Sequence, residues 1–211
     1  MTKADLIEKY RDINVDYGDW YDYVYEGFTE VMQARGVKVE RIFFSGFWSQ
    51  GDGACFEGHV SDWDRLIEAY NMTAYLPYTA KMLKVMVDKG DEPGFSVAQQ
   101  GHYYHENSTR FSTDVEEFLE RYTNVDNTEQ RELDVQMYAR LSQAALVEEP
   151  EKWLIQQFKD EMRKLYSQLE AAHVWLTSDE AVWDTVVANE LDKECKDGAD
   201  TVADQESSVC V

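Results

Sequence analysis

Basic side chains are scarce in this sequence. Its 211 residues include 20 Lys or Arg against 42 Asp or Glu, so the formal net charge is −22 at pH 7 and the pI is about 4.4. Binding to nucleic acid or to an anionic membrane surface draws its affinity from clustered Lys and Arg, and this composition therefore excludes direct binding to either. If charge governs recognition, the partner presents a basic surface.

Cysteines and long apolar runs are also few. Cys55, Cys195 and Cys210 are an odd number without the spacing of a disulfide framework, which favours a reducing compartment. No apolar run approaches the roughly 18 residues of a membrane span, and no basic-then-apolar leader opens the sequence. We therefore expect a soluble protein that is not exported, and we expect no cofactor.

Core-forming residues, by contrast, are plentiful. Hydrophobic residues make up 44% of the chain and aromatic residues 13%, too much for a disordered acidic chain. A chain of this length buries roughly 70% of its unfolded surface on folding, so it needs neither disulfides nor a structural metal. We expect one α+β domain over residues 1–190, with the sheet-containing part in about 1–122 and a helical part in about 128–190. Residues 191–211 are predicted to be a flexible acidic tail.

The hydrophobic period changes along the chain. Residues 16–36 have helical period, with Asp16 as the predicted cap. Period-two runs predict strands over 38–48 and 54–60, joined as a hairpin by glycine-rich residues, and again over 95–104 and 109–118. Helices are predicted from a cap at Asp62 or Ser61, over 74–89, and throughout the segment from Thr128. The fold class expected is α+β, with a small antiparallel sheet packed against several helices.

Acidic residues form the first candidate binding surface. Five of them fall within one arc of the predicted helix 16–36, namely Asp16, Asp19, Asp22, Glu26 and Glu30. Their spacing of about one helical turn, roughly 5 Å, is near the 6–7 Å or so between phosphates along a DNA strand, so such a row can imitate a phosphate field. A second acidic patch begins at Asp114 and includes Glu116, Glu117 and Glu120. The alternative is an ordinary solvated helix face.

A cysteine and three histidines form the second candidate site. The string Asp52-Gly-Ala-Cys55-Phe56 resembles the nucleophile box of ovarian-tumour-type cysteine proteases, and His102-Tyr103 resembles their His-aromatic box. In that interpretation His102 deprotonates Cys55 while Gln50 or glycine amides stabilise an oxyanion. The β-prone flanks of Cys55 argue against it, because a strand supplies no helix dipole to lower the thiol pKa.

The same residues allow two other interpretations. Four side chains of the types that bind zinc are present, although their spacing is unusual for a zinc finger: Cys55, His59, His102 and His105. Simple packing is the third interpretation, because buried cysteines behave as small hydrophobes and glycines serve turn geometry.

Three strings resemble one family. FSGFWSQGDGACFEG, GHYYHE and LTSDEAVWDTVVANE, within residues 10–190, are similar to a family of small proteins encoded by tailed bacteriophages and sometimes labelled antitoxin-like. The resemblance implies an early or accessory phage protein acting in bacterial cytoplasm.

Together these features favour a non-enzymatic, phage-encoded inhibitor. We expect it to bind a basic surface of a host or phage protein, in particular a nucleic-acid-handling defence protein, by imitating nucleic acid. One alternative is the hydrolase with Cys55 and His102. The other is an antitoxin-like binding partner whose aromatic helix faces place Trp20 or Trp183 in an interface.

Overall fold

The computed structural model describes residues 1–123 and 132–194. The chain divides into two compact units, one formed by Met1–Asp22 with the residues from Leu169 onward, the other by Tyr23–Gln168. Helices and an antiparallel sheet make up the fold, so the predicted α+β class is confirmed. No helix among the described residues is long and apolar enough to cross a membrane.

The sheet of the 23–168 unit is a four-stranded antiparallel meander. Its order β1-β2-β3-β4 follows the chain, with β1 at Val37–Phe44, β2 at Ala54–Val60, β3 at Phe95–Gln99 and β4 at Thr109–Thr113. The predicted hairpin of the first two strands is therefore correct. Phe43 pairs with Cys55 and Arg41 with Glu57, which places each pair on one face of the sheet.

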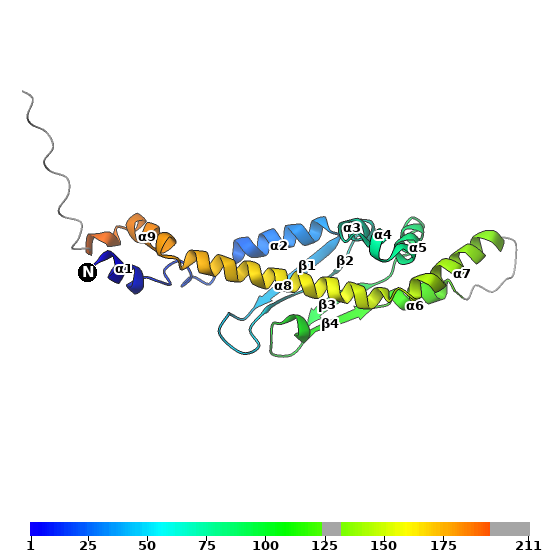
Figure 1. The fold of residues 1–211 in the computed structure, drawn as a ribbon, viewed down its shortest axis with the longest axis horizontal. Coiled ribbons are helices and arrows are strands. Elements are labelled where there is room, and N and C mark those ends of the chain that lie inside the picture. The colour runs from blue at the N-terminus through cyan, green and yellow to red at the C-terminus, as the bar shows by residue number, and fades with distance from the viewer. Residues whose placement is uncertain (124–131, 195–211) are drawn as a thin grey trace, which may run out of the picture. The chain divides into compact units, whose positions relative to one another are not determined.

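Two helices cover the opposite face of this sheet (Figure 1). They are α2 (Asp22–Ala34) and the long α8 (Pro150–Leu176). The ring of Phe56 on β2 lies 5.4 Å from Phe28 on α2 and 6.0 Å from Phe158 on α8, measured between centroids. Because both helices contact the same ring, they share one core beneath the sheet.

A buried ion pair fixes the C-terminal end of α2 to α8. Arg35 Nη1 lies 2.7 Å from Glu161 Oε2, and only 4% of the Glu161 side chain is exposed. Lys164 Nζ lies 2.8 Å from the other carboxylate oxygen. The Glu161 carboxylate raises the pKa of Arg35 although burial opposes it. This cluster joins the residue that follows α2 to the middle of α8.

Short helices complete the unit. They are α3 (Trp63–Ala69), α4 (Met72–Tyr75), α5 (Pro77–Val87), α6 (Val115–Arg121) and α7 (Glu132–Leu146), with the 3-10 turn η1 at Glu106–Ser108. Asp62 caps α3, as predicted, by accepting from Arg65 N–H at 3.0 Å. The Glu148 carboxylate caps α5 by accepting from the N–H groups of Tyr78 and Thr79.

The other unit joins the N-terminus to the C-terminal helices. It contains α1 (Lys3–Lys9), α9 (Asp179–Ala188), the end of α8 and the 3-10 turn η2 (Leu191–Glu194). Its core is Ile7 against Val182 and Val186. Polar side chains bridge the same segments: Arg11 donates to the Thr177 carbonyl at 3.1 Å and Asn14 to the Leu176 carbonyl at 2.9 Å.

Several predicted boundaries were wrong. The helix predicted over 16–36 begins at Asp22, and residues 11–21 form successive turns, so Asp16 is not its cap. Gly18 disfavours helix in that stretch. The strand predicted over 109–118 ends at Thr113, because Val115, Phe118 and Leu119 bury one face of α6. Pro77 starts α5 and divides the helix predicted over 74–89.

The end of the chain also differs from expectation. Residues 191–194 of the predicted tail form η2, and Leu191 packs against the core of its unit. The remainder of that predicted tail, residues 195–211, lies outside the described residues, as do residues 124–131.

Candidate functional site

The acidic helix face is partly as predicted. Asp22, Glu26 and Glu30 follow one another at i, i+4 and i+8 on α2, and all three are exposed; we name them the acid row. The buried face of α2 carries Val24, Phe28 and Met32. No ion pair among the described residues involves the acid row, whose carboxylates are about 6 Å apart along the helix axis.

The other two predicted members lie elsewhere. Asp16 and Asp19 are exposed in the turns before α2, outside the helix. The prediction of a single five-residue stripe was therefore wrong, because the helix that would have aligned it starts six residues after Asp16.

The second acidic patch is formed on α6. Glu117 and Glu120 are exposed, whereas Glu116 is half-buried. Burial raises the pKa of Glu116, with further contributions from the negative charges of Glu151, Glu120 and Glu149. The Glu151 carboxylate accepts from the Glu116 N–H at 3.0 Å and so caps α6. Asp114, where the patch begins, accepts from the Gly94 N–H at 2.5 Å, so part of this patch has a structural role.

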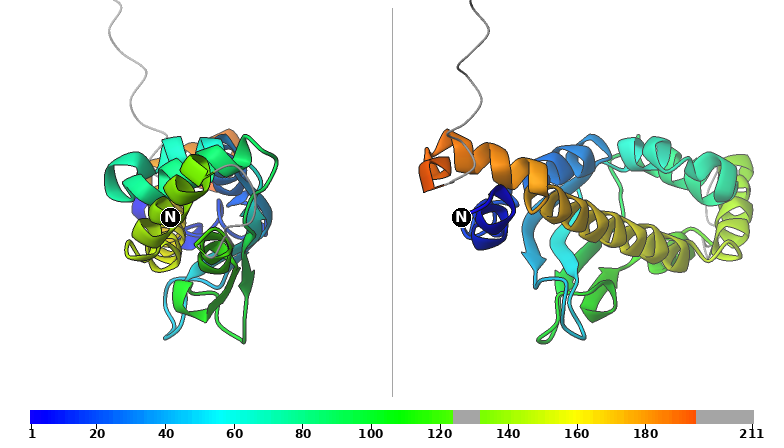
Figure 2. Two further views of the ribbon diagram at one scale, coloured as in Figure 1. Left: turned by 90° about the vertical axis from the view of Figure 1, so that its right-hand side faces the viewer. Right: turned by 60° about the vertical axis from the view of Figure 1, so that its left-hand side comes forward.

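Two loops bring the distinctive sequence strings together. Residues 45–53 join β1 to β2 and residues 100–108 follow β3; we name these segments the loop pair. Both views in Figure 2 show them extending from the same end of the sheet. The rings of Phe43 and Tyr104 are 5.1 Å apart across them.

Close packing explains two glycines of residues 45–53, Gly51 and Gly53. A Cβ on Gly51 would lie 2.5 Å from the Tyr103 ring, and the Gly51 φ of +93° also favours glycine. A Cβ on Gly53 would lie 2.5 Å from the Tyr104 carbonyl oxygen. Gly53, whose φ is not positive, therefore serves the close approach of the two loops.

Cys55 is buried next to the contacts between the two loops and is not exposed to solvent. Its side chain is fully buried on β2 opposite Phe43, and burial, followed by the charge of Glu57, raises the pKa of the thiol to about 12. His102 is exposed in the loop after β3, and Gln50 is exposed in the β1–β2 turn. No hydrogen bond among the described residues joins Cys55 to His102. The structure gives the thiol neither a base nor a helix dipole.

Two of the four candidate metal ligands, His59 and His105, contact other side chains or backbone groups. His59 Nδ1 lies 3.2 Å from Glu40 Oε1, while His105 Nδ1 accepts from the Asn107 N–H at 3.1 Å and lies 3.0 Å from Glu106 Oε2. Within the described ranges, no three His, Cys, Asp or Glu side chains gather in a cluster that could hold a metal. Cys55, His59, His102 and His105 thus do not form the predicted site.

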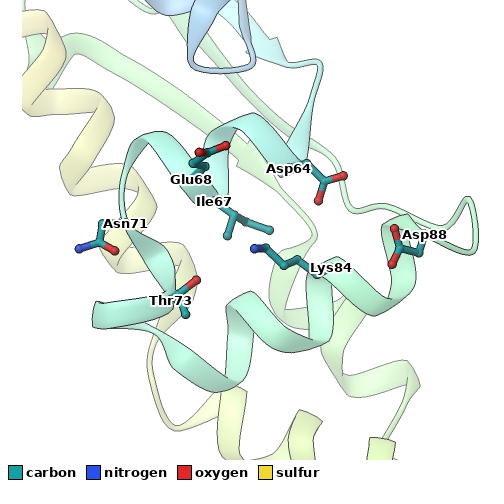
Figure 3. Close-up of a pocket in the computed structure, with 7 residues that line it drawn as sticks. All are labelled: Asp64, Ile67, Glu68, Asn71, Thr73, Lys84 and Asp88. Carbon is teal, nitrogen blue, oxygen red and sulfur yellow. The ribbon is translucent and has the colours of Figure 1, made fainter.

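Sequence reasoning missed a hollow of about 500 Å³ beside α3, α4 and α5 (Figure 3). Lys84 extends into it, and Ile67 lies at its centre. Three carboxylates surround this single amine, and no ion pair among the described residues joins them to it. The available signal was the i, i+4 spacing of Asp64 and Glu68. The lining is Asp64, Ile67, Glu68, Asn71, Thr73, Lys84 and Asp88.

The two tryptophans of the antitoxin-like alternative, Trp20 and Trp183, are half-buried within their own unit. The Trp20 ring lies 5.6 Å from His173, and Lys3 Nζ lies 4.4 Å from the centroid of Trp183. Trp183 also packs against the core formed by Ile7, Val182 and Val186.

Comparisons with known proteins give a family for the chain. No curated protein and no solved structure matches it. A family model described as "Domain of unknown function (DUF8835)" matches residues 20–179. That range includes the acid row, the loop pair and the hollow. Since the match spans more than half of the 211 residues, the chain belongs to the DUF8835 family.

Proposed function

We propose that this chain is a non-enzymatic acidic inhibitor that binds the basic surface of a nucleic-acid-handling protein and keeps nucleic acid away from it. The observation that carries the proposal is the acid row: Asp22, Glu26 and Glu30 are exposed, evenly spaced and without ion pairs among the described residues. In keeping with the resemblance to phage proteins, the target is a host defence protein in the bacterial cytoplasm.

The distribution of ion pairs supports this function. Several cations are already neutralised by acids of this chain: Arg35 and Lys164 by Glu161, and Arg163 by Asp160. Acids outnumber bases by 22 overall, so pairing leaves an excess of carboxylates facing solvent. Exposed charges of one sign attract an oppositely charged partner over a Debye length, about 8 Å at physiological salt.

The burial of Cys55 supports the non-enzymatic part of the proposal. A thiol with a pKa near 12, no base within hydrogen-bond reach among the described residues and no exposed surface is unsuited to nucleophilic catalysis. Packing accounts for the glycines around it as well.

The test begins with affinity purification from infected cells and identification of the captured protein by mass spectrometry. Labelled DNA or RNA bound to that protein is then titrated with this chain. We expect stoichiometric displacement of the nucleic acid, because the two ligands compete for one surface. Simultaneous binding of this chain and the nucleic acid would contradict the proposal.

Two double variants locate the binding surface. Glu26→Lys with Glu30→Lys reverses two charges of the acid row; Glu180→Lys with Asp184→Lys reverses two exposed acids at the same i, i+4 spacing on α9. Both change the net charge by +4, so they reduce the overall attraction equally. We expect at least about tenfold greater loss of affinity from the α2 variant, as for charge pairs formed in an interface. Equal losses would contradict a role for the acid row.

A further inference from the structure

The loop pair presents two aromatic rings to solvent. Trp48 is 86% exposed, more than any other large hydrophobic side chain in the described ranges, and Tyr103 is 58% exposed. Neither ring contributes to the core beneath the sheet. Exposed Trp and Tyr side chains are the residues most enriched among the anchors of protein interfaces.

This part of the molecule is held firmly. Arg163 on α8 donates to Glu106 at 3.2 Å, and Lys159 on α8 donates to Asn107 at 3.2 Å, which ties residues 100–108 to the helix. The Phe47 ring lies 5.6 Å from Tyr166, and Gly51 lies against Tyr103, so residues 45–53 are held in turn. Rings on an ordered support lose little conformational entropy on binding.

Both acids of the loop pair are already engaged by groups of this chain. Its acids are Asp52, whose carboxylate accepts from the Ser49 N–H at 2.6 Å, and Glu106, which is paired with Arg163. The net charge of −22 repels nucleic acid and a second copy of this chain, and it attracts basic proteins. A partner at the loop pair is therefore expected to present cations to aromatic faces.

The chain itself already pairs cations with ring faces. Lys3 Nζ lies 4.4 Å from the Trp183 centroid, and Lys89 Nζ lies 4.3 Å from that of Tyr138. Such contacts are strongest with Trp, and the planar guanidinium of Arg can stack on the ring as well.

We infer that the loop pair is an anchoring site for arginine side chains of a basic protein partner, which stack on Trp48 and Tyr103. The inference rests on the proposed function, because it assumes a basic partner, and it adds a contact that does not depend on the acid row. The acid row supplies attraction that salt weakens, whereas a stacked guanidinium supplies a contact that salt weakens less.

The test measures binding of a nine-arginine peptide and a nine-lysine peptide to the full chain at several salt concentrations. Trp48→Ala is compared with Tyr75→Ala, which removes a ring that is 66% exposed on α4. We expect Trp48→Ala to weaken binding of the arginine peptide about 3- to 30-fold, more than that of the lysine peptide. The slope of log Kd against log salt should stay unchanged, and Tyr75→Ala should have little effect.

Three outcomes would overturn the inference. The first is unchanged affinity for the arginine peptide in Trp48→Ala; the second is an equal loss in Tyr75→Ala. The third is a concentration-dependent dimer of the wild-type chain that Trp48→Ala abolishes in sedimentation experiments, because the occupant would then be a second copy. Glu26→Lys with Glu30→Lys tests the acid row independently, so failure of this site and failure of the proposed function give different results.

Discussion

The acid row on α2 and the loop pair both lie within residues 20–179, which the family model matches, but they differ in how they pack. The acid row is solvated and without ion pairs among the described residues, and only the other face of α2 packs against the core. In the loop pair, the first segment packs against the Tyr103 ring and the Tyr104 carbonyl of the second. A side chain therefore has no room at Gly51 or Gly53. Packing thus accounts for the unusual composition of the loops but does not require the three carboxylates.

This difference separates structural from functional explanations. Cys55 and the glycines have a sufficient structural role, whereas packing does not explain the acid row, and Trp48 keeps 86% of its surface exposed to solvent. For the acid row and Trp48, our proposed explanation is binding to a partner. Four predictions test the structural roles in this comparison, in order of decreasing expected effect.

The first prediction concerns the thiol beneath the loop pair. In a Cys195→Ser, Cys210→Ser background, Cys55 should react with iodoacetamide at pH 8 about a thousandfold more slowly in the folded chain than in urea. The pKa near 12 leaves very little thiolate, and burial excludes the reagent. Rapid labelling of the folded chain, followed by mass spectrometry, would revive the hydrolase interpretation.

The second prediction concerns the support of the acid row. Arg35→Ala should lower the free energy of unfolding by about 2–3 kcal/mol, because it leaves the buried Glu161 carboxylate without its closest partner. Arg65→Ala removes an exposed pair with Asp62 and should cost less than about 1 kcal/mol. Urea unfolding measures both, and similar costs would show that the Arg35 pair does not fix α2.

The third prediction compares the two regions directly. Gly53→Ala should destabilise the chain by about 2 kcal/mol, because the new Cβ meets the backbone of the facing loop. Gly27→Ala on α2 should instead stabilise it by roughly 0.5–1 kcal/mol, since nothing lies within 4 Å of that position and alanine favours helix. Thermal unfolding would contradict the comparison if both changes had the same sign.

The fourth prediction, with the smallest expected change in stability, concerns Glu116 in the second acidic patch. Because the pKa of Glu116 is raised in the folded chain, its ionised form is unfavourable above that pKa. Glu116→Gln should therefore stabilise the chain slightly at pH 7, by about 0.3 kcal/mol, and the gain should vanish as the pH falls below the pKa of the unfolded chain. Urea unfolding at pH 7 and pH 4 measures the difference. A gain that persists at pH 4 would mean that charge is not its cause.

Local signals in the sequence predicted much of the fold. The hairpin of β1 and β2, the cap at Asp62 and the buried face of α2 follow from short-range period and polarity. The start of α2 was missed because the apolar period continues through Tyr17 and Trp20, although the backbone there forms turns.

The candidate sites were less predictable for the same reason. Contact between Gly51 and Tyr103 depends on two loops about fifty residues apart, which no local pattern reveals. The sequence therefore made Cys55 resemble a nucleophile, although tertiary packing buries it. The acid row could be predicted in part, because Glu26 and Glu30 lie well inside a strongly amphipathic helix.

The salt dependence of affinity for the captured partner tests the central claim most directly. The dissociation constants of the wild-type chain, of Glu26→Lys with Glu30→Lys, and of Glu180→Lys with Asp184→Lys are measured from low to high ionic strength. We expect a steep slope for the wild type, a clearly shallower slope for the α2 variant, and a slope near that of the wild type for the α9 variant. A wild-type affinity that does not change with salt, or equal slopes for both variants, would contradict binding through the acid row.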